Sequence, residues 1–592
     1  MCGIAGIVRY DQPGAESENQ LRAMLRALRH RGPDDQGVAA LACAALGNAR
    51  LSFLDRAGGK QPMSDAEGRW TITYNGEIYN YAALRAELDG RWRFRADCDT
   101  EIVLAAYAIW GESALVRLNG MFAFFIWDNV EACGFAARDR LGVKPLAYRH
   151  HAGLFAFASE AKALLPCLPS RPKANLDGVL EYLVAPYFSG VETSMFEGIE
   201  YLAPGHCLRI DREGLTVRSW WEWEPPDHFD ADSGALAEDL AARVSSAVRD
   251  SLHGEHPCAT FLSGGLDSTL IAALAARQLE TPPTAYTIQF AGQDGFDYRR
   301  SRIVRSDDTP HARAAARELG LSHHVITAAR ERLPFDLSEV AAINDALPAW
   351  EQEIAQHHLA RAASATHRAV LVGDGADETH YGYPFLLDHE ASSTPRRIME
   401  RFGRAPISRA LIADSTALFD EKYRALAESA GYRWDTADER LHATTYLIVT
   451  RWLPRLLHNG DIHTMAFSLE ARVPFADCRL LALARRVDPL LALSDGEEKG
   501  MLRKAARGLM PEANRIRRKS ALPKDQRTAE IYQREAGAAL AESGDFLNVW
   551  LELEPLRALV TVPRALSENE RSLLFRIIAL HHWRRAYDVQ TP

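Results

Sequence analysis

The chain has 592 residues, of which 47% are hydrophobic and 25% charged, a composition typical of globular proteins. This length exceeds what one hydrophobic core usually organises, so we expect roughly two or three domains. The net charge of −10 argues against a nucleic-acid-binding surface and favours small-molecule substrates. Neither a signal peptide nor an apolar run long enough to span a membrane is predicted. We therefore expect a cytoplasmic protein whose eight cysteines, none in a CxxC pair, are free thiols.

Residues 1–210 predict an α+β domain in which short apolar strands are separated by turn residues. Expected strands are 2–8, 70–74, 121–127, 133–137 and 154–158, and apolar residues at helical spacing predict helices at 21–29 and 100–110. Residues 211–235 are expected to form a linker, because they include a stretch rich in Pro, Asp and aromatic residues that has no period.

Residues 236–592 begin with an alternation of strands and helices. Strands are expected at 259–262, 284–290 and 369–372, with a helix at 267–278 after the first. This alternation is typical of an α/β doubly wound parallel sheet. The final portion is rich in Arg and Leu and predicts a helical C-terminal part.

Cys2 follows the initiator methionine and precedes a glycine. Methionine before a small residue is normally removed, which would leave Cys2 with a free α-amine. That amine has an ordinary pKa of roughly 7.7–8.0, so it can accept the thiol proton and place nucleophile and base in one residue. An unreactive cysteine in an N-terminal strand is the alternative, and this position alone does not decide between them.

Further residues in this half are of the types that an enzyme of acyl transfer requires. Asn75 and Gly76 place a side-chain amide beside a glycine N–H, the donors that an oxyanion hole requires. Arg50 carries a guanidinium suited to a carboxylate. Asp99 stands at the start of a predicted helix, where it can also serve only as an N-cap.

With the stretches 120–124 (GMFAF) and 138–145 (RDRLGVKP), these residues resemble the class II glutamine amidotransferase domain. The resemblance implies an N-terminal-nucleophile fold of layered sheets and helices (αββα). It also implies that Cys2 is the nucleophile and that Asn75 and Gly76 are the oxyanion donors. Arg50 would hold the α-carboxylate of glutamine, Glu77 and Asp99 its α-amine, and Asn75 would also contact the substrate. The family pattern HRRLS reads NARLS at 48–52, which keeps the arginine.

The stretch 263–268 (SGGLDS) lies between a predicted strand and a predicted helix. Its glycines let the backbone approach a phosphate, and the helix N-terminus favours an anion. No GxxxxGKS/T pattern is present, which excludes the loop of kinases and GTPases. The stretch resembles the pyrophosphate loop of enzymes that split ATP into AMP and pyrophosphate. A plain turn is the alternative, which the strand–loop–helix context disfavours. The nucleotide-binding candidates of the loop are Ser263, Gly264, Gly265, Asp267 and Ser268.

A second stretch, 373–378 (GDGADE), directly follows the expected strand 369–372. Asp267 and Asp377 are natural oxygen ligands for Mg²⁺, which proteins usually hold with one or two carboxylates plus substrate phosphates. Lys499 could neutralise charge on a leaving pyrophosphate. The stretch 468–475 (SLEARVPF) is equally specific, although its Glu–Arg pair can be interior scaffolding.

In this order behind an N-terminal cysteine domain, these stretches resemble the glutamine-hydrolysing asparagine synthetase family over nearly the whole chain. The resemblance implies ATP contacts at Leu262, Ile288, Val372 and Gly373, and Glu378 as an acid/base in amidation. It implies glutamine hydrolysis, activation of a carboxylate as an acyl-adenylate, and amidation with aspartate as the favoured acceptor. An internal ammonia tunnel and a homodimer are further implications.

Three stretches depart from the family pattern. The motif DELFGGY reads DETHYGY at 377–383, and the upstream Asp-Glu-Pro is replaced near 344–348 (NDALP). The segment Gly295 to Arg305 contains one tyrosine and four arginines, which form either a solvated loop or a grip on an acidic acceptor. Amidation of another carboxylic acid in a specialised or cell-envelope pathway is thus an alternative. A catalytically silent nucleotide-binding relative is another. A β-lactam-forming relative is disfavoured, because it needs no glutaminase cysteine.

Overall fold

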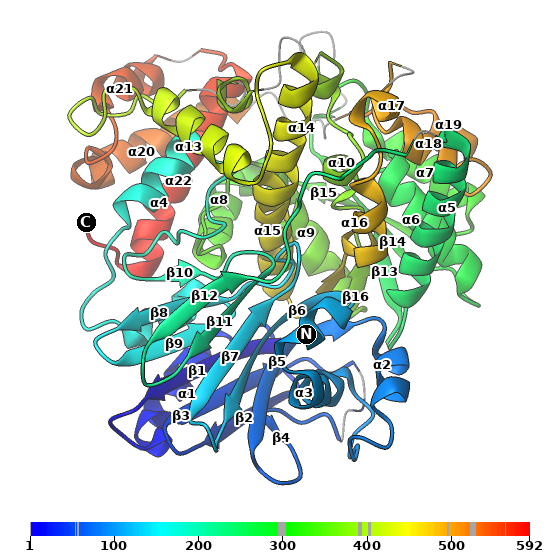
Figure 1. The fold of residues 1–592 in the computed structure, drawn as a ribbon. Helices are drawn as coiled ribbons and strands as arrows, with labels where there is room; N and C mark the ends of the chain where they lie inside the picture. Colours follow the sequence, from blue (N-terminus) through cyan, green and yellow to red (C-terminus); the bar gives the residue numbers. More distant parts are fainter. Residues whose placement is uncertain are drawn as a thin grey trace.

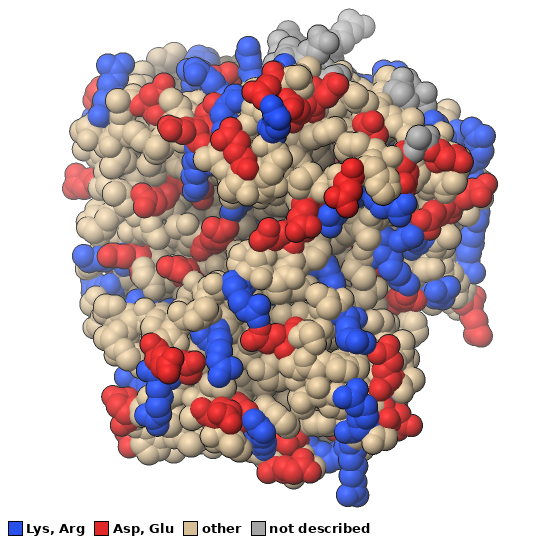
Figure 2. Space-filling view, viewed as in Figure 1, with Lys and Arg blue, Asp and Glu red and all other residues tan. Residues whose placement is uncertain are grey.

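The computed structural model describes residues 2–592 apart from 54, 56–57, 231, 255, 294–295, 297–303, 389–393, 401–403, 494–495, 521–527 and 563. The N-terminal sheets form the lower part of the molecule in Figure 1, and the parallel sheet with most of the helices lies above them. On the face shown in Figure 2, acidic and basic side chains are interspersed over most of the surface. No helix among the described residues is long and apolar enough to cross a membrane.

The N-terminal half contains two six-stranded antiparallel sheets. The first has the order β10-β8-β9-β1-β3-β2 and the second β12-β11-β7-β6-β5-β4. The strands of the first are β1 (Cys2–Arg9), β2 (Asp35–Ala40), β3 (Ala44–Arg50), β8 (Ala147–His151), β9 (Leu154–Ala158) and β10 (Glu200–Tyr201). Those of the second are β4 (Met63–Ser64), β5 (Trp70–Ile78), β6 (Gly120–Asp128), β7 (Cys133–Arg138), β11 (His206–Ile210) and β12 (Leu215–Ser219).

Alternating apolar side chains stack these sheets into layers. Along β6, Phe125 and Trp127 join the core between the two sheets, while Phe122 packs with helix α3 (Asp99–Trp110) on the outer side. On the other side, α1 (Glu18–Ala27) packs against β1 and β3. Successive side chains of a strand point to opposite faces, so both faces of each central strand are apolar. The predicted αββα domain is confirmed, and the expected strands 2–8, 70–74, 121–127, 133–137 and 154–158 all lie in observed strands.

The stretch expected to be a linker, 211–235, contains regular structure at both ends. β12 pairs antiparallel with β11 and extends the second sheet. At the other end, α5 (Ser233–Asp250) begins with Asp232 as its N-cap, whose side chain accepts from the backbone N–H groups of the first turn. Of its described residues, those at 211–214 and those between Ser219 and Ser233 lie outside strands and helices.

The second half is built on a five-stranded parallel sheet with the order β15-β14-β13-β16-β17. The strands are β13 (Cys258–Phe261), β14 (Ala285–Phe290), β15 (His323–Ala328), β16 (Ala369–Leu371) and β17 (Glu470–Arg472). From β13 the chain first builds outward through β14 and β15, and then returns to add β16 on the other side. The strand order therefore reverses between β13 and β16, and the crevice outside the carboxyl ends of such strands is where α/β sheets bind ligands.

Helices surround this sheet and form the C-terminal part, as predicted (Figure 1). After β13 the described helices are α6 (Leu266–Gln278), α7 (Asp308–Glu318), α8 (Leu333–Ile343), α9 (Gln352–Ser364), α10 (Ala376–Thr379), α12 (Pro395–Glu400), α13 (Ser415–Ser429), α14 (Ala437–Leu447), α15 (Leu453–Met465), α16 (Cys478–Ala484), α17 (Pro489–Leu493), α18 (Gly500–Ala505), α19 (Glu512–Arg515), α20 (Ala529–Leu547), α21 (Leu553–Thr561) and α22 (Glu568–Tyr587). Two further helices of the described residues precede the sheet in the chain: α2 (Tyr81–Leu88), which packs with α3, and α4 (Leu176–Val184), which packs with α13. A π-helical turn, Ile448–Trp452, joins α14 to α15.

A buried cluster of charges joins the two halves. Arg31 of the N-terminal half is fully buried and donates to Asp461 of α15 at 2.6 Å and to Glu160 at 2.8 Å. Lys144 donates to the other oxygen of Asp461 at 3.1 Å. Because these charges are shielded from water, Lys144 and Asp461 depend on partners across the interface, and Arg31 is paired on both sides of it.

Candidate active sites

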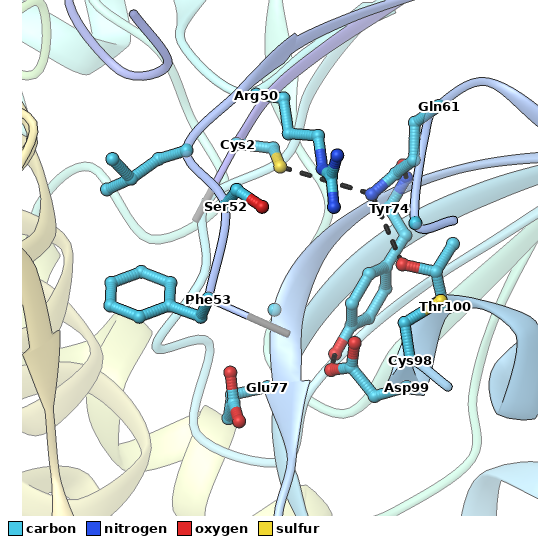
Figure 3. Close-up of a pocket in the computed structure, with 13 residues that line it drawn as sticks. Cys2, Arg50, Ser52, Phe53, Gln61, Tyr74, Glu77, Cys98, Asp99 and Thr100 are labelled. Carbon is cyan, nitrogen blue, oxygen red and sulfur yellow. Dashed lines mark hydrogen bonds between the residues drawn. The ribbon is translucent and has the colours of Figure 1, made fainter. Parts of the chain in front are cut away.

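A pocket with about 360 Å³ of empty space opens beside Cys2 (Figure 3). The register of β1 with β3 sets Cys2 opposite Arg50. Figure 3 shows these two residues at one end of the pocket and Glu77 and Asp99 at the other. Its lining residues are Cys2, Arg50, Leu51, Ser52, Phe53, Gly59, Gln61, Tyr74, Gly76, Glu77, Cys98, Asp99 and Thr100. The structure thus brings together every predicted glutaminase residue except Asn75, which contacts Cys2 directly.

Gln61 is a neighbour of Cys2 that sequence reasoning missed. Its Nε2 lies 4.0 Å from Cys2 Sγ, within reach of a weak hydrogen bond to sulfur. The amide is held in place because its Oε1 accepts from Tyr74 N at 2.6 Å, and its Nε2 also donates to Thr100 Oγ1 at 3.3 Å. No sequence motif marks Gln61, so only the folded chain reveals it.

Asn75 and Gly76 have the properties of oxyanion donors. Asn75 Oδ1 accepts from Cys2 N at 3.0 Å, which fixes the orientation of the side-chain amide. Its Nδ2 is buried and has no hydrogen-bond partner among the described residues. A buried donor left unpaired in the resting protein is available to a developing oxyanion. A Cβ at Gly76 would lie 2.4 Å from Met121 O, so only glycine lets β5 approach β6 here.

The two ends of the pocket carry opposite charge. Arg50 donates to Asp55 O at 3.0 Å. Asp99 accepts from the Tyr74 hydroxyl at 2.7 Å and from Ile78 N at 3.1 Å, and burial raises the pKa of its carboxyl. Burial also raises the pKa of Glu77 to about 8. A guanidinium facing two desolvated carboxylates suits an amino-acid zwitterion, whose ammonium would restore their charged forms.

The predicted nucleotide loop lies at the carboxyl end of β13, at the reversal of strand order. The hydroxyls of Ser263 and Ser268 are 3.0 Å apart across the loop. Gly264 has a φ of +72°, and a Cβ there would lie 2.4 Å from Ala312 N, so the turn requires glycine. A Cβ at Gly373 would lie 3.1 Å from Ser268 N, which places the loop after β16 against this one.

The remaining predicted ATP contacts lie at the same edge of the sheet. Leu262 directly follows β13, and its N donates to Tyr286 O at 2.9 Å. Ile288 lies in β14 and Val372 directly follows β16, and all three side chains are buried. The candidates that are far apart in the sequence therefore lie in or directly after the adjacent strands β14, β13 and β16.

Lys499 joins the two predicted metal ligands. Its Nζ donates to Asp267 and lies 2.6 Å from Asp377 Oδ1. Lys519, which sequence reasoning did not select, donates to the other oxygen of Asp377. Although burial opposes it, Lys499 and Lys519 lower the pKa of Asp377 to about 2, whereas burial raises the pKa of Asp267. Lys499 itself has a φ of +59°, a strained conformation held by its surroundings.

These carboxylates fit a Mg²⁺ ion that depends on substrate phosphates. Asp267 Oδ1 is buried and accepts no hydrogen bond from the described part of the chain. Within that same part, no group of three or more His, Cys, Asp or Glu side chains is arranged to hold a metal. Mg²⁺ commonly takes only one or two protein carboxylates and completes its shell with phosphate and water.

Glu378 has the environment of an acid/base. Burial, followed by the charge of Asp377, raises the pKa of its carboxyl to about 7, and the Tyr383 hydroxyl donates to it. A group with such a pKa can exchange protons near neutral pH. His380, by contrast, lies 5.7 Å from the ring of Phe475, and burial lowers its pKa to about 3. It is therefore neutral and packed.

The other two stretches that depart from the family pattern are 344–348 and 295–305, and the structure describes the first fully and the second only in part. Asp345 of the 344–348 stretch accepts from Lys162 N at 2.8 Å and from the Tyr201 hydroxyl at 3.2 Å, so this stretch contacts the N-terminal half. Most of 295–305, including Tyr298, Arg299, Arg300 and Arg302, lies outside the described residues. The hypothesis that this segment grips an acceptor stays a prediction.

Two family models match the chain: a glutamine amidotransferase domain over residues 1–221, and asparagine synthase over residues 239–585. Asparagine synthetase [glutamine-hydrolyzing] 3 of Bacillus subtilis is 32% identical over 536 residues, covering 88% of this chain and 87% of that protein. Asparagine synthetase [glutamine-hydrolyzing] 1 of the same organism is 27% identical, with the same coverage. Amidase chry2 of Gibberella zeae is 26% identical and covers 86% of each chain.

Proposed function

This chain belongs to the asparagine synthase family of glutamine-dependent amidotransferases, and we propose that it amidates a carboxylic acid, with aspartate as the first candidate. The observation that carries the proposal is the presence of two chemically complementary sites in one chain. Cys2 lies beside an unpaired Asn75 amide, and a phosphate loop lies beside the Lys499–Asp377 pair. The first suits ammonia release from an amide, and the second suits ATP cleavage.

At the first site, the free α-amine of mature Cys2 takes the thiol proton, and Sγ attacks the glutamine carboxamide carbon. The oxyanion accepts hydrogen bonds from Asn75 Nδ2 and Gly76 N. The intermediate collapses to a thioester as ammonia leaves. Water then hydrolyses the thioester to glutamate and restores the thiol. Arg50 holds the substrate α-carboxylate, and Glu77 and Asp99 hold its α-amine.

At the second site, an oxygen of the acceptor carboxylate attacks the α-phosphorus of ATP, and pyrophosphate leaves. Lys499 and Lys519 offset the charge that develops on the departing phosphates. Asp267 and Asp377 would hold Mg²⁺, which supplies further charge neutralisation when bound. Ammonia then attacks the acyl carbon and AMP leaves. Glu378 accepts a proton from the attacking nitrogen.

The second candidate is amidation of a larger acid. Tyr383, which donates to Glu378, stacks on Trp452 at 4.7 Å and on Phe385 at 5.5 Å between ring centroids. Aromatic faces beside the acid/base favour an acceptor with an apolar part. The similarity to a protein named an amidase supports keeping this candidate. A catalytically silent relative is disfavoured by the intact Cys2 pocket. A homodimer and a cytoplasmic location are proposed from the family resemblance and the sequence alone.

The test is an acid panel. The purified protein is mixed with glutamine, ATP, Mg²⁺ and one acid at a time, and glutamate, pyrophosphate and the amide product are measured. Amide formation only with aspartate supports asparagine synthesis, and formation with another acid supports the second candidate. If glutamate is released but no acid yields pyrophosphate, the ligase proposal is wrong. If neither product forms, the chain is a silent relative.

A further inference from the structure

Arg472, the last residue of β17, belongs to the second half of the chain but contacts the glutamine pocket of the first. Its Nη2 lies 3.8 Å from Glu77 Oε2, and its guanidinium carbon lies 5.1 Å from the centre of the Phe53 ring. Glu77 and Phe53 both line the pocket. The Arg472 side chain is only 2% exposed, so it forms part of the protein wall behind these two residues.

The guanidinium is fixed from its own half. Its Nε donates to Glu470 Oε1 at 2.5 Å, and its Nη1 donates to Ser251 O at 2.9 Å and to His253 O. Its Nη2, by contrast, is buried without a hydrogen-bond partner among the described residues. Nη2, the guanidinium nitrogen without a hydrogen bond to the described residues, is therefore the one closest to Glu77. A buried guanidinium that is hydrogen-bonded along one edge holds the positive charge of its other edge in a fixed position.

We propose that Arg472 is a positioning residue for glutamine recognition, which orients the Glu77 carboxylate toward the substrate α-amine from across the domain interface. The inference rests on the proposed function, because it needs Glu77 to bind the amine of glutamine. It adds that the glutamine pocket is completed by the synthetase half. The chemical class recognised is a free α-amino acid. Its ammonium would approach the Glu77 carboxylate from the pocket, on the side opposite Arg472.

The electrostatics of the pocket support this role. Burial raises the pKa of Glu77 to about 8, and Arg472 acts against that rise. The other charged groups that act on Glu77 are Asp99, Glu470 and the positive amino terminus. Titratable phenols nearby are Tyr74, Tyr79 and Tyr81. Without Arg472, Glu77 would face two carboxylates, and its pKa would rise further. Less of the charged carboxylate would then be present at neutral pH to bind an ammonium.

The test compares Arg472→Met with the unchanged full-length chain. Glutamate release is measured against glutamine concentration across pH, and pyrophosphate release is measured with ammonium in place of glutamine. We expect the KM for glutamine to rise by about tenfold, which corresponds to one unit of pKa. The pH profile of 1/KM should move to higher pH. Ammonium-supported activity and the kcat for glutamate release should change by less than about threefold.

Two further variants separate positioning from folding. Arg472→Lys keeps the charge and should restore most of the affinity and the pH profile. Asn119→Ala removes another buried contact between the halves, in which Asn119 Nδ2 donates to Asp477 Oδ2 at 2.9 Å. Because Asn119 does not line the pocket, this variant should leave the KM for glutamine unchanged.

An unchanged KM and pH profile in Arg472→Met would overturn the proposal while leaving the proposed function intact. A rise in KM of the same size in Asn119→Ala would also overturn it, because the effect would then be general to the interface. If Arg472→Met does not fold, Arg472→Gln, which also removes the charge, is compared in the native chain and in Glu77→Gln. An effect of equal size in both would contradict the role, and an effect only with Glu77 present would support it. Absence of glutamate release from the unchanged chain would instead remove the proposed function.

Discussion

Because the side-chain amide nitrogen of Asn75 is unpaired within the described residues, we expect removal of the amide to lower the glutaminase activity while leaving the thermal stability almost unchanged. Replacing Asn75 by alanine removes one oxyanion donor. Loss of such a donor costs about 2.7–4 kcal/mol of transition-state stabilisation, or about 10²–10³ in kcat. In the resting protein, however, Nδ2 makes no hydrogen bond within the described residues. Its removal relieves the cost of an unpaired buried group, about 1–3 kcal/mol, while Cys2 N loses its Asn75 acceptor, which costs about 1–3 kcal/mol in turn. These terms oppose each other, so Tm should change little.

The assay measures kcat for glutamate release, ammonium-supported pyrophosphate release and Tm for the same preparation. Ammonium-supported activity should be unchanged, because Asn75 belongs to the first site. Asn344→Ala is the matched control for stability. This residue is also fully buried, but its Nδ2 donates to Glu353 Oε2 at 2.8 Å and its Oδ1 accepts from Ala346 N at 3.1 Å, so its loss should lower Tm. The reasoning is refuted if Asn75→Ala keeps its glutaminase kcat within about threefold of the unchanged chain.

Three other substitutions test the division of labour. Cys2→Ala should abolish glutamate release and keep ammonium-supported amide formation, and loss of both would contradict separate sites. Asp267→Asn should remove pyrophosphate release while glutaminase activity survives, and full ATP cleavage would exclude Asp267 from the metal site. Burial raises the pKa of Glu378 to about 7, so its charged, proton-accepting form is gained as pH rises through that value. At a fixed concentration of free ammonia, ammonium-supported synthesis should therefore increase from pH 6 to about pH 8. Glu378→Gln should flatten this dependence of activity on pH. An unchanged pH profile in that variant would show that another group is the base.

Much of both sites could be predicted because the chemistry is carried by local stretches. Asn75, Gly76 and Glu77 are consecutive, and a single strand, β5, carries them all. The nucleotide loop likewise needs only the strand before it and the helix after it. Parallel strands with the observed order then bring the loops after β13 and β16 to the same edge of the sheet, as the strand–helix alternation implies.

What sequence reasoning missed depends on contacts between distant residues. Gln61 meets Cys2 across 59 positions, and Lys519 meets Asp377 across 142 positions. Neither lies in a motif that specifies its partner, so only the tertiary packing within each half pairs them. β12 was missed for a different reason. Its side chains are mostly exposed, so it has no apolar alternation, and its pairing with β11 defines it instead.

The buried charges around Asp461 also determine how the two halves can be separated. Separating the halves would break the Arg31–Asp461 and Lys144–Asp461 pairs, of which, among the described residues, Arg31 alone would keep a counter-charge, Glu160, within its own half. Breaking a buried ion pair by removing one partner costs about 3–5 kcal/mol. A cut between Trp220 and Phe229, by contrast, would break no strand or helix of the described residues. We expect the two pieces to stay associated after such a cut, because the buried ion pairs do not depend on the covalent link. The glutamine pocket and the nucleotide loop would thereby be kept in equal numbers.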